Sequence, residues 1–337
     1  MRMIIVGFGT VGQSLARILQ SKEEQLLIEF GFHPRIVALV DRTGAMIDPG
    51  GLDLNRAVTV KQKTGSVAQD TKLGRQGMGA KEVIESVEAE AVLELTPSNI
   101  ADGEPGLSHI KAALRSRRHV ITASKAPLAI AMPSLVEMAS YNNVLLKFSG
   151  SVGGGTPILD FAKKCFSGNK IESLRGILNG TTNYILTRMM ESNAPMDAAL
   201  KEAQALGYAE ADPSYDIDGV DTASKLVILM NWVMGRESSI KDVEIEGIRK
   251  VTPQDLEQAR RKNSHIKLVG SIDDEIRVQP EQIPRTHPLC IGGILNAVSF
   301  KTELTGEVTI VGKGGGGVET ASAVLRDIVD VRRNLAR

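Results

Sequence analysis

The sequence predicts an α/β protein with a Rossmann-type, doubly wound parallel sheet and an inserted α+β domain. Three observations lead to this prediction. Strand-like apolar runs alternate with helical segments over the first 148 residues, a glycine-rich turn follows the first run, and the alternation weakens after residue 150. A length of 337 residues also suggests roughly two domains, at about 100–200 residues each.

The first domain is expected to consist of short buried strands separated by helices. Residues 2–6 form an apolar run that ends in glycine, and the helix-like segment SLARILQ follows. Further strands are expected at 35–41, 91–96, 119–124 and 144–149. The Gly- and Asp-rich stretch after the second strand, from Thr43 to about Asn55, is expected to form loops.

The second domain lacks this alternation and is expected to be α+β. Its expected helices cover residues 157–166, 182–190, 197–207 and 221–234. Its expected strands cover residues 173–179, 266–272, 289–294 and 296–302. A last strand at 307–312 leads into the loop GKGGGG and then into a helix, and the expected apolar face of that helix consists of Ala321, Val324, Leu325, Ile328 and Val331.

Composition argues against several classes of protein. The formal net charge of +0 gives no reason to expect nucleic acid or an anionic membrane as a partner. The two cysteines, Cys165 and Cys290, fit a reducing compartment rather than a disulfide framework. The N-terminus enters a strand without a signal peptide, and the longest apolar run is shorter than the ~20 residues of a membrane span. We therefore expect a cytoplasmic protein.

The motif GFGTVG lies between the first strand and the first helix and predicts dinucleotide binding. Gly7 permits the tight turn, Gly9 lets a pyrophosphate approach the backbone, and Gly12 lets helix and strand pack closely. Thr10 and Val11 open the helix, whose first N–H groups are donors for phosphate. The alternative is a structural turn that binds nothing.

Other cofactor contacts are expected where strands end. Asp41 ends the second strand, where a ribose hydroxyl is bound, and Arg42 beside it suits a 2′-phosphate, so NAD and NADP both remain candidates. Thr96, Pro97 and Ser98 follow a later strand, and ligands bind outside the carboxyl ends of such strands.

Three further motifs have a functional and a structural interpretation. Lys125 ends TASK, where it would face the nicotinamide, or it is a surface lysine at a helix start. In NGTTNY, Gly180 and Thr182 are donors for a substrate carboxylate, or they belong to an ordinary helix cap. The glycines of SGSVGGGTP form a linker, or they turn carbonyl groups toward a hard cation.

Other kinds of catalytic site find little support. The five histidines show no paired ligand spacing, no GxSxG is present, and GKGGGG lacks the Ser or Thr of a P-loop. Cys165, in AKKCF, is expected on a helix face rather than as a nucleophile.

The acidic stretch AEADPSYDIDGVDTASK, residues 209–225, precedes the apolar run LVILM. Asp221 and Lys225 are four residues apart and share one helix face, so a hydrogen-bonded pair is expected at the start of a buried helix. A surface ion pair with acids near a helix N-terminus would explain the other aspartates, but it explains Glu210 poorly.

Together these motifs resemble the homoserine dehydrogenase family along nearly the whole chain. GFGTVG, ELTPSN, TASKAPLA, SVGGGTP, GILNGTTNYIL, LGYAEADPSYDIDGVDTASKL and TASAVLRDI follow the family's pattern in order, and the acidic run is the most specific. The chain resembles the short form, without a fused aspartate kinase or a C-terminal ligand-sensing domain. Two departures are TASK, where TANK is commoner, and Ser149, where the family often has Glu.

The resemblance implies an NAD(P)-dependent oxidoreductase that interconverts L-homoserine and L-aspartate 4-semialdehyde in the aspartate-derived synthesis of threonine, methionine and isoleucine. It implies that Lys225 donates the proton, with Lys125 near the same oxygen and the nicotinamide. Asp221 is expected at both the catalytic and the substrate-binding site, and Glu210 is expected to bind the substrate's ammonium group.

The resemblance also implies a homodimer and a bound monovalent cation, sodium. The cation would be held by the backbone carbonyls of Ser149, Val152, Gly154 and Thr156. The glycine loop that contains Gly314 is expected near the cofactor. This assigns residues 1–148 and 308–337 to the NAD(P)-binding domain, and residues 149–307 to a catalytic and dimerisation domain.

Two alternatives remain. The first is a related amino-acid semialdehyde dehydrogenase; a phosphorylating one would need a reactive cysteine in a cleft. The second is a non-catalytic dinucleotide-sensing protein, which is expected to lose Lys225, Lys125 or Glu210. All three residues are present.

Overall fold

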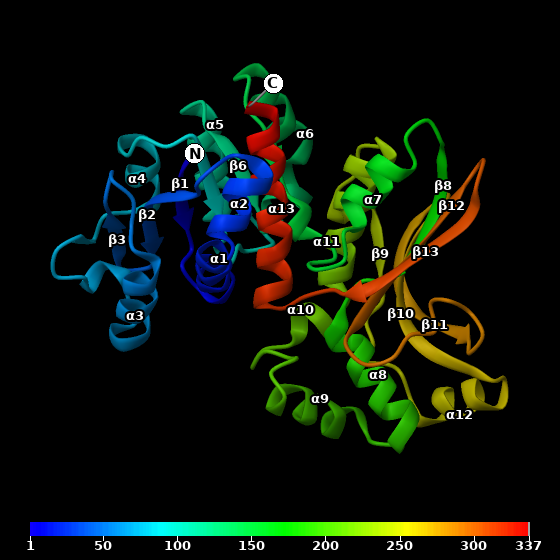
Figure 1. Cartoon of the computed structure of the whole chain (residues 1–337). Helices are drawn as coiled ribbons and strands as arrows, with labels where there is room; N and C mark the ends of the chain where they lie inside the picture. The colour runs from blue at the N-terminus through cyan, green and yellow to red at the C-terminus, as the bar shows by residue number, and fades with distance from the viewer. Residues whose placement is uncertain (336–337) are drawn as a thin grey trace. The chain divides into compact units, whose positions relative to one another are not determined.

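A computed structural model describes residues 1–335 as two compact units (Figure 1). Unit 1 comprises Met1–Gly154 and the chain from Gly316 onward, and unit 2 comprises Gly155–Gly315. The first division falls later than residue 148. The second falls later than residue 307, because the strand before Gly315 pairs along its length with another strand of unit 2. Within the described residues, no helix has the length and apolar character that crossing a membrane requires.

Unit 1 is built on a seven-stranded sheet of order β4-β3-β2-β1-β5-β6-β7. The strands are β1 (Arg2–Val6), β2 (Arg35–Asp41), β3 (Gly44–Ile47), β4 (Gly74–Gln76), β5 (Ala91–Glu94), β6 (His119–Thr122) and β7 (Leu146–Lys147). The helices are α1 (Thr10–Ser21), α2 (Glu23–Phe30), α3 (Leu54–Thr64), η1 (Val67–Gln69), α4 (Ala80–Ser86), α5 (Gly106–Arg115), α6 (Ala126–Tyr141), η2 (Ser149–Ser151) and α13 (Gly317–Leu335). Strands β2, β1, β5, β6 and β7 run parallel, which confirms the predicted Rossmann-type sheet.

The core of unit 1 joins the two ends of the described chain. Met3 and Ile5 of β1 are fully buried because the parallel strand has neighbours on both sides and helices over its faces. Helix α13 lies beside α1 in Figure 1. Its Ala321, Val324 and Ile328 are fully buried in the same cluster as β1. The predicted apolar face of this helix is confirmed.

Unit 2 contains a six-stranded sheet of order β13-β12-β8-β10-β11-β9. The strands are β8 (Ile171–Ile177), β9 (Val243–Ile245), β10 (Ser264–Ile272), β11 (Ile276–Pro284), β12 (Leu295–Thr302) and β13 (Gly306–Lys313). The helices are α7 (Ile158–Cys165), α8 (Gly180–Ser192), α9 (Met196–Ala205), α10 (Ser214–Ile217), α11 (Val220–Leu229), η3 (Met230–Met234), η4 (Ile240–Asp242) and α12 (Pro253–Arg261). Helix α11 packs closely on β10 at Gly270. A side chain at this position would overlap Thr222 and Leu226 of the helix.

The predicted loop after β2 is wrong, because this stretch contains β3 and the start of α3. β3 pairs antiparallel with β2 and with β4, so one edge of the predicted parallel sheet is antiparallel. Asp53 caps α3 by accepting the N–H groups of Asn55 and Arg56, and Gly65 ends the helix in a left-handed conformation.

The strand predicted at 289–294 is also wrong. The N–H groups of Leu289 and Cys290 bond to His287, and that of Ile291 bonds to Leu289, so local turns replace a ladder. Leu289 is buried against the face of the sheet, which explains the apolar run. β11 was not predicted, because its two prolines and its charged residues obscure the alternation.

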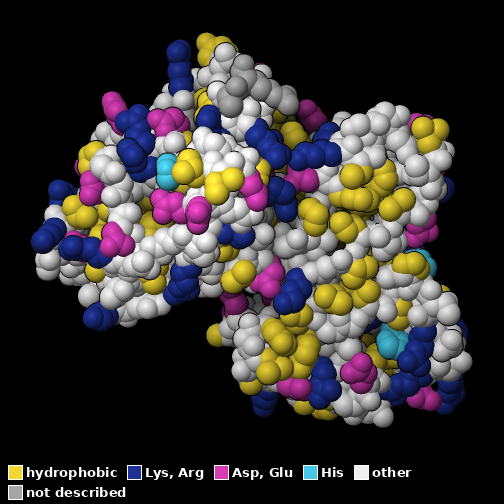
Figure 2. Space-filling view, in the orientation of Figure 1, with side chains coloured by type: hydrophobic (Ala, Val, Ile, Leu, Met, Phe, Trp, Pro, Cys, Tyr) yellow, Lys and Arg dark blue, Asp and Glu magenta, His cyan; other side chains and the backbone are white. Residues whose placement is uncertain are grey.

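Hydrophobic side chains also lie on the surface of unit 2. Figure 2 shows them gathered around α7 and β13 on the face in view. Val311 of β13 is 46% exposed, and Leu304, in the turn before it, is 72% exposed. β13 is an edge strand, so an open strand edge lies beside exposed apolar side chains.

Lys267 of β10 is a cation that unit 2 buries completely. Its Nζ donates to Asn183 Oδ1 at 2.8 Å and to Thr187 Oγ1 at 3.0 Å, both on α8. These partners are neutral, and burial lowers the pKa of Lys267 to about 8. The lysine ties α8 to the sheet at a cost in desolvation.

This burial predicts an unusual pH dependence of stability. Lys267 has a pKa of about 8 in the folded chain against an ordinary value of 10.5, so between these values the unfolded chain binds more protons. The free energy of unfolding should therefore rise across this window, by up to about 3 kcal/mol, relative to a Lys267→Met variant. Urea denaturation of both proteins below pH 8 and near pH 10.5 measures this. If the difference in the free energy of unfolding between the two proteins is the same at both pH values, the prediction is wrong.

Candidate functional site

The glycine loop of unit 1 has the geometry of an anion site. Gly7 has φ +96°, and a side chain there would overlap the backbone of Leu95 and Thr96. A side chain on Gly12 would overlap the carbonyl oxygen of Gly7. At Gly9, by contrast, nothing lies within 4 Å of a built Cβ, and no side chain caps α1 there. The first N–H groups of α1, which contains the predicted Thr10 and Val11, therefore begin at a position with room for a phosphate.

Asp41 ends β2 as predicted, but both oxygens of its carboxylate already accept hydrogen bonds from other residues of this chain. Lys61 Nζ lies 2.8 Å from Oδ2, Ser66 Oγ lies 2.9 Å from Oδ1, and the N–H groups of Val67 and Thr43 also donate to it. Burial raises the pKa of Asp41, but Lys61 and these hydrogen bonds outweigh it and hold the pKa below its ordinary value. The neighbouring Arg42 is exposed.

Glu94, which the sequence analysis did not single out, joins the ends of β5 and β6. It is fully buried and accepts hydrogen bonds from the hydroxyls of Thr96, Thr122 and Ser124. Ser124 Oγ also lies 2.7 Å from the carbonyl oxygen of Thr96, so the two predicted loops are tied together. The available signal was an acid within the otherwise apolar strand AVLE.

Residues predicted to contact the cofactor lie in these two loops. Thr96 is half-buried, Pro97 is exposed, and the Oγ atom of Ser98 is buried without a partner among the described residues. Lys125 follows Ser124 directly and is the N-cap residue of α6. The hydrogen bond between Glu94 and Ser124 therefore holds the segment that directly precedes Lys125.

In unit 2, Lys225 and Asp221 form the predicted pair on one face of α11. Lys225 Nζ lies 2.6 Å from Asp221 Oδ2, and the side chains are 9% and 3% exposed. The ammonium group also donates to the carbonyl oxygen of Leu178, the first residue after β8. Nζ is thus aimed by two acceptors from different elements, one of them charged.

Two further residues complete this site, which we call the Lys225 cluster: Leu178, Asn179, Asp216, Asp221 and Lys225. Asn179 Nδ2 donates to Asp216 Oδ1 at 2.6 Å and to Asp221 Oδ2 at 2.9 Å. The sequence analysis included Asp216 only among the acids that an alternative interpretation places near a helix N-terminus, and it did not name Asn179, because their contact depends on tertiary structure. Asp218, two residues on, instead pairs with Arg249 at the surface.

The other predicted substrate residues surround α8 and the acidic segment. Gly180 begins α8, and Thr182 is buried with its hydroxyl 3.0 Å from Asn179 Oδ1, so this hydroxyl belongs to the helix cap. Glu210 is exposed between α9 and α10, and its backbone carbonyl accepts from Gln204. No described hydrogen bond brings the Glu210 carboxylate into the Lys225 cluster.

The predicted cation loop spans the division between the units. Ser149, Val152 and Gly154 belong to unit 1, and Thr156 belongs to unit 2. The N–H and hydroxyl groups of Ser149 donate to Asp327 of α13, and Thr156 Oγ1 lies 3.0 Å from the carbonyl oxygen of Lys313. Among residues 1–335 no group of three or more His, Cys, Asp or Glu side chains is arranged to hold a metal ion.

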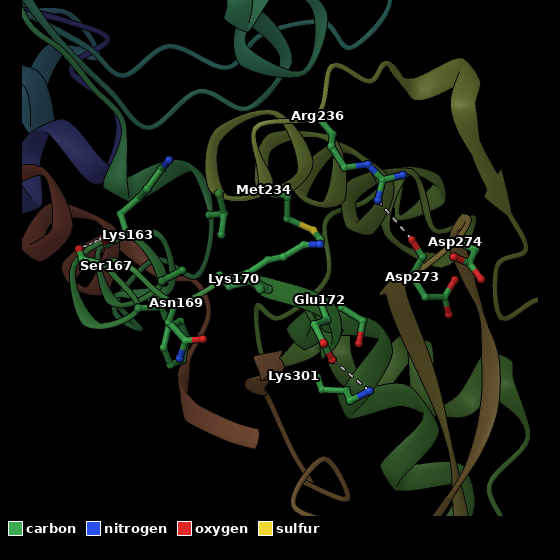
Figure 3. Close-up of a pocket in the computed structure, with 15 residues that line it drawn as sticks. Lys163, Ser167, Asn169, Lys170, Glu172, Met234, Arg236, Asp273, Asp274 and Lys301 are labelled. Atoms are coloured by element: carbon green, nitrogen blue, oxygen red, sulfur yellow. Dashed lines mark hydrogen bonds and ion pairs between the residues drawn. The ribbon is translucent and has the colours of Figure 1, made fainter. Parts of the chain in front are cut away.

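A hollow of about 780 Å³ lies elsewhere in unit 2 (Figure 3). It borders the start of β8 at Glu172, whereas the Lys225 cluster lies beyond the end of that strand. Lys301 pairs with Glu172 at 3.2 Å, and Arg236 reaches the backbone of Asp273. Because its charged residues are exposed and none belongs to the Lys225 cluster, we regard the hollow as separate from the candidate site.

Comparison with known proteins connects these features to one family. Residues 157–329 match the family model described as Homoserine dehydrogenase, and residues 1–139 match the model described as Glutamate/Leucine/Phenylalanine/Valine dehydrogenase. The chain is 45% identical to a homoserine dehydrogenase of Methanocaldococcus jannaschii, with 98% of each chain covered. It is 38% identical to an NAD(+)-dependent homoserine dehydrogenase of Pseudomonas canavaninivorans, covering 100% of this chain and 97% of the relative.

Solved structures agree with the sequence relatives. A hyperthermophilic archaeal homoserine dehydrogenase in complex with NADPH superposes with a TM-score of 0.87 at 31% identity, covering 99% of this chain and 98% of that one. The matches extend over both units and include the regions that hold the glycine loop and the Lys225 cluster. The chain therefore belongs to the homoserine dehydrogenase family, the NAD(P)-dependent oxidoreductases that interconvert L-homoserine and L-aspartate 4-semialdehyde.

Proposed function

We propose that Lys225 transfers the proton in this reaction. The observation that carries the proposal is the placement of its Nζ between Asp221 and the carbonyl oxygen of Leu178. The chemistry that a bound reduced nicotinamide would supply is a hydride for the aldehyde carbon, so that negative charge would develop on the substrate oxygen. Lys225 gives that oxygen a proton, so the C=O bond becomes an alcohol and the lysine is left neutral until water reprotonates it. Oxidation of homoserine runs the same transfer in reverse.

Substrate recognition is proposed to divide between acids and N–H donors. Homoserine carries an ammonium group and a carboxylate. Glu210 and Asp221 suit the ammonium group, and Asp216 extends the same negative surface through Asn179. The N–H groups of Gly180 and Thr181 at the start of α8 suit the carboxylate because the helix dipole favours an anion there, whereas the N–H of Thr182 already donates to Asn179 Oδ1.

Lys125 is proposed to act from unit 1, beside the nicotinamide and the same substrate oxygen. Its support is local: it follows the segment that Glu94 fixes at the carboxyl ends of β5 and β6. In a parallel sheet this edge is the one at which ligands bind. Gly314 is proposed to approach the cofactor from the loop that follows β13.

NADP is proposed as the preferred cofactor. An acid that binds the ribose hydroxyls favours NAD, but the oxygens of Asp41 already accept from Lys61, Ser66, Val67 and Thr43. Lys61 also neutralises the charge that would repel a 2′-phosphate. Arg42 stays exposed beside this pair and offers a guanidinium group to the phosphate.

The family's cation and dimer are proposed for this chain as well. The cation would be sodium, bound by the carbonyls of Ser149, Val152, Gly154 and Thr156, with η2 and the left-handed Gly153 and Gly154 after it turning the backbone. The dimer would form through unit 2, where the edge strand β13 and the exposed Val311 and Leu304 lie together.

The proton-transfer role is tested with Lys225→Met. Reduced nicotinamide formed from L-homoserine and NADP+ or NAD+ is followed by absorbance, with serine and threonine as substrate controls. We expect turnover to fall by at least about 100-fold, the scale of lost general acid–base catalysis, with the circular dichroism spectrum retained. Lys267→Met removes another buried lysine and should retain turnover. Normal turnover in folded Lys225→Met would remove Lys225 from the mechanism.

The cofactor preference is tested with Arg42→Ala. Loss of a charge-assisted contact to the 2′-phosphate should lower kcat/KM for NADP+ about 10- to 100-fold, with little change for NAD+. Arg115→Ala removes an exposed arginine at the end of α5 and should change neither value. Equal losses with both cofactors would mean that Arg42 does not read the phosphate.

A further inference from the structure

Asn296 of β12 is a buried amide whose nitrogen is hydrogen-bonded and whose oxygen is not. The side chain is 1% exposed, and Nδ2 donates to the carbonyl oxygen of Leu178 at 2.8 Å. Its Oδ1 atom is buried and has no partner among the described residues. An unsatisfied buried acceptor costs about 1–3 kcal/mol, so stability alone gives a poor reason for an asparagine at this position.

The carbonyl that Asn296 contacts is the one that holds Lys225. A carbonyl oxygen has two lone pairs. Lys225 Nζ donates to the oxygen of Leu178, and Asn296 Nδ2 donates to the same atom. With one lone pair taken by the amide, the ammonium group is confined to the other.

The fold places Asn296 there and keeps it in place. β12 pairs antiparallel with β8, with Ala297 opposite Ile177, so one further step of this register sets Asn296 opposite Leu178. On its other side lies Gly314, where a Cβ atom would overlap the amide group of Asn296. Packing from this side limits the rotation of the amide.

We propose that Asn296 is a positioning residue for Lys225, which directs the ammonium group toward the substrate oxygen through the carbonyl that the two side chains share. This inference rests on the proposed role of Lys225 in proton transfer. It assigns Asn296 no contact with substrate or cofactor. Its contribution is to the direction of Nζ rather than to substrate affinity or to the stability of the fold.

The test compares two substitutions of Asn296. Asn296→Leu removes both polar atoms at similar volume, and misdirection of Nζ should lower kcat about 10- to 100-fold while KM for homoserine stays within about twofold. Its Tm should be nearly unchanged, because the orphan oxygen leaves together with the hydrogen bond. Asn296→Ala serves the same comparison if the leucine variant does not fold.

Asn296→Asp tests whether the side chain at position 296 lies close enough to Nζ to act on Lys225, and the separation of kcat from KM in Asn296→Leu distinguishes positioning from a purely structural role. An added carboxylate beside Nζ stabilises the ammonium form of Lys225, and homoserine oxidation needs the neutral amine. The pH profile of oxidation should therefore move to higher pH in this variant. An unmoved profile would count against the proposal.

Asn183→Ala is the matched control. Asn183 is equally buried, its Nδ2 donates to the carbonyl oxygen of Leu295 at 3.0 Å, and its Oδ1 accepts from Lys267. Its loss should lower Tm and leave kcat and the pH profile unchanged. If the Asn296 variants behave like this control, losing stability but keeping kcat, the proposal is wrong. If Lys225→Met retains turnover, the proposed proton-transfer role of Lys225 is wrong, and this result is distinct from a failure of the Asn296 proposal alone.

Discussion

A buried ammonium–carboxylate pair is the interaction on which the arrangement of unit 2 depends. Lys225 and Asp221 lie 2.6 Å apart and almost out of contact with water, where each ion loses several kcal/mol of hydration. Such a pair persists only when further groups satisfy the remaining donors and acceptors. Leu178 and Asn179, consecutive residues between β8 and α8, bond to the pair directly. Asn296 of β12 donates to the carbonyl oxygen of Leu178, so two separate segments converge on α11. Gly219 allows this helix to start close to Ile245 and Val278.

Unit 1 solves a related problem with different chemistry. Glu94 is as deeply buried as Asp221, but the donors around it include the hydroxyls of Thr96, Thr122 and Ser124. These hydroxyl donors hold the carboxylate in place by hydrogen bonds, and the imidazole of His109 lies 3.5 Å from it, where unit 2 has a lysine. This suits a group that orders two loops, whereas the lysine of unit 2 has to carry the transferable proton itself. The two units thus use a buried acid for two purposes, one organising backbone and one orienting an ammonium group.

The parts of the site that the sequence predicted are those that depend on local spacing. Gly7, Gly9 and Gly12 lie in one turn, and Asp221 and Lys225 are one helical turn apart, so a fixed local geometry relates them. Asn179 joins Asp216 to Asp221 across a gap of about 40 residues, and no periodicity marks such a contact. The apolar segment at Leu289 was predicted as a strand because a segment that packs against the face of a sheet has apolar side chains, as a strand within the sheet does.

The route of the chain has a consequence for how the protein is made. The chain leaves unit 1 after Gly154 and returns to it only at Gly316, so α13 supplies Ala321, Val324 and Ile328 to a core whose first strand is β1. During synthesis, β1 emerges before unit 2 and its helical neighbour α13 emerges after unit 2. Unit 2 is therefore synthesised completely before unit 1 is. Until α13 is made, the part of the unit 1 core that α13 covers remains exposed. Nascent chains of this architecture therefore need protection from aggregation until α13 has been made.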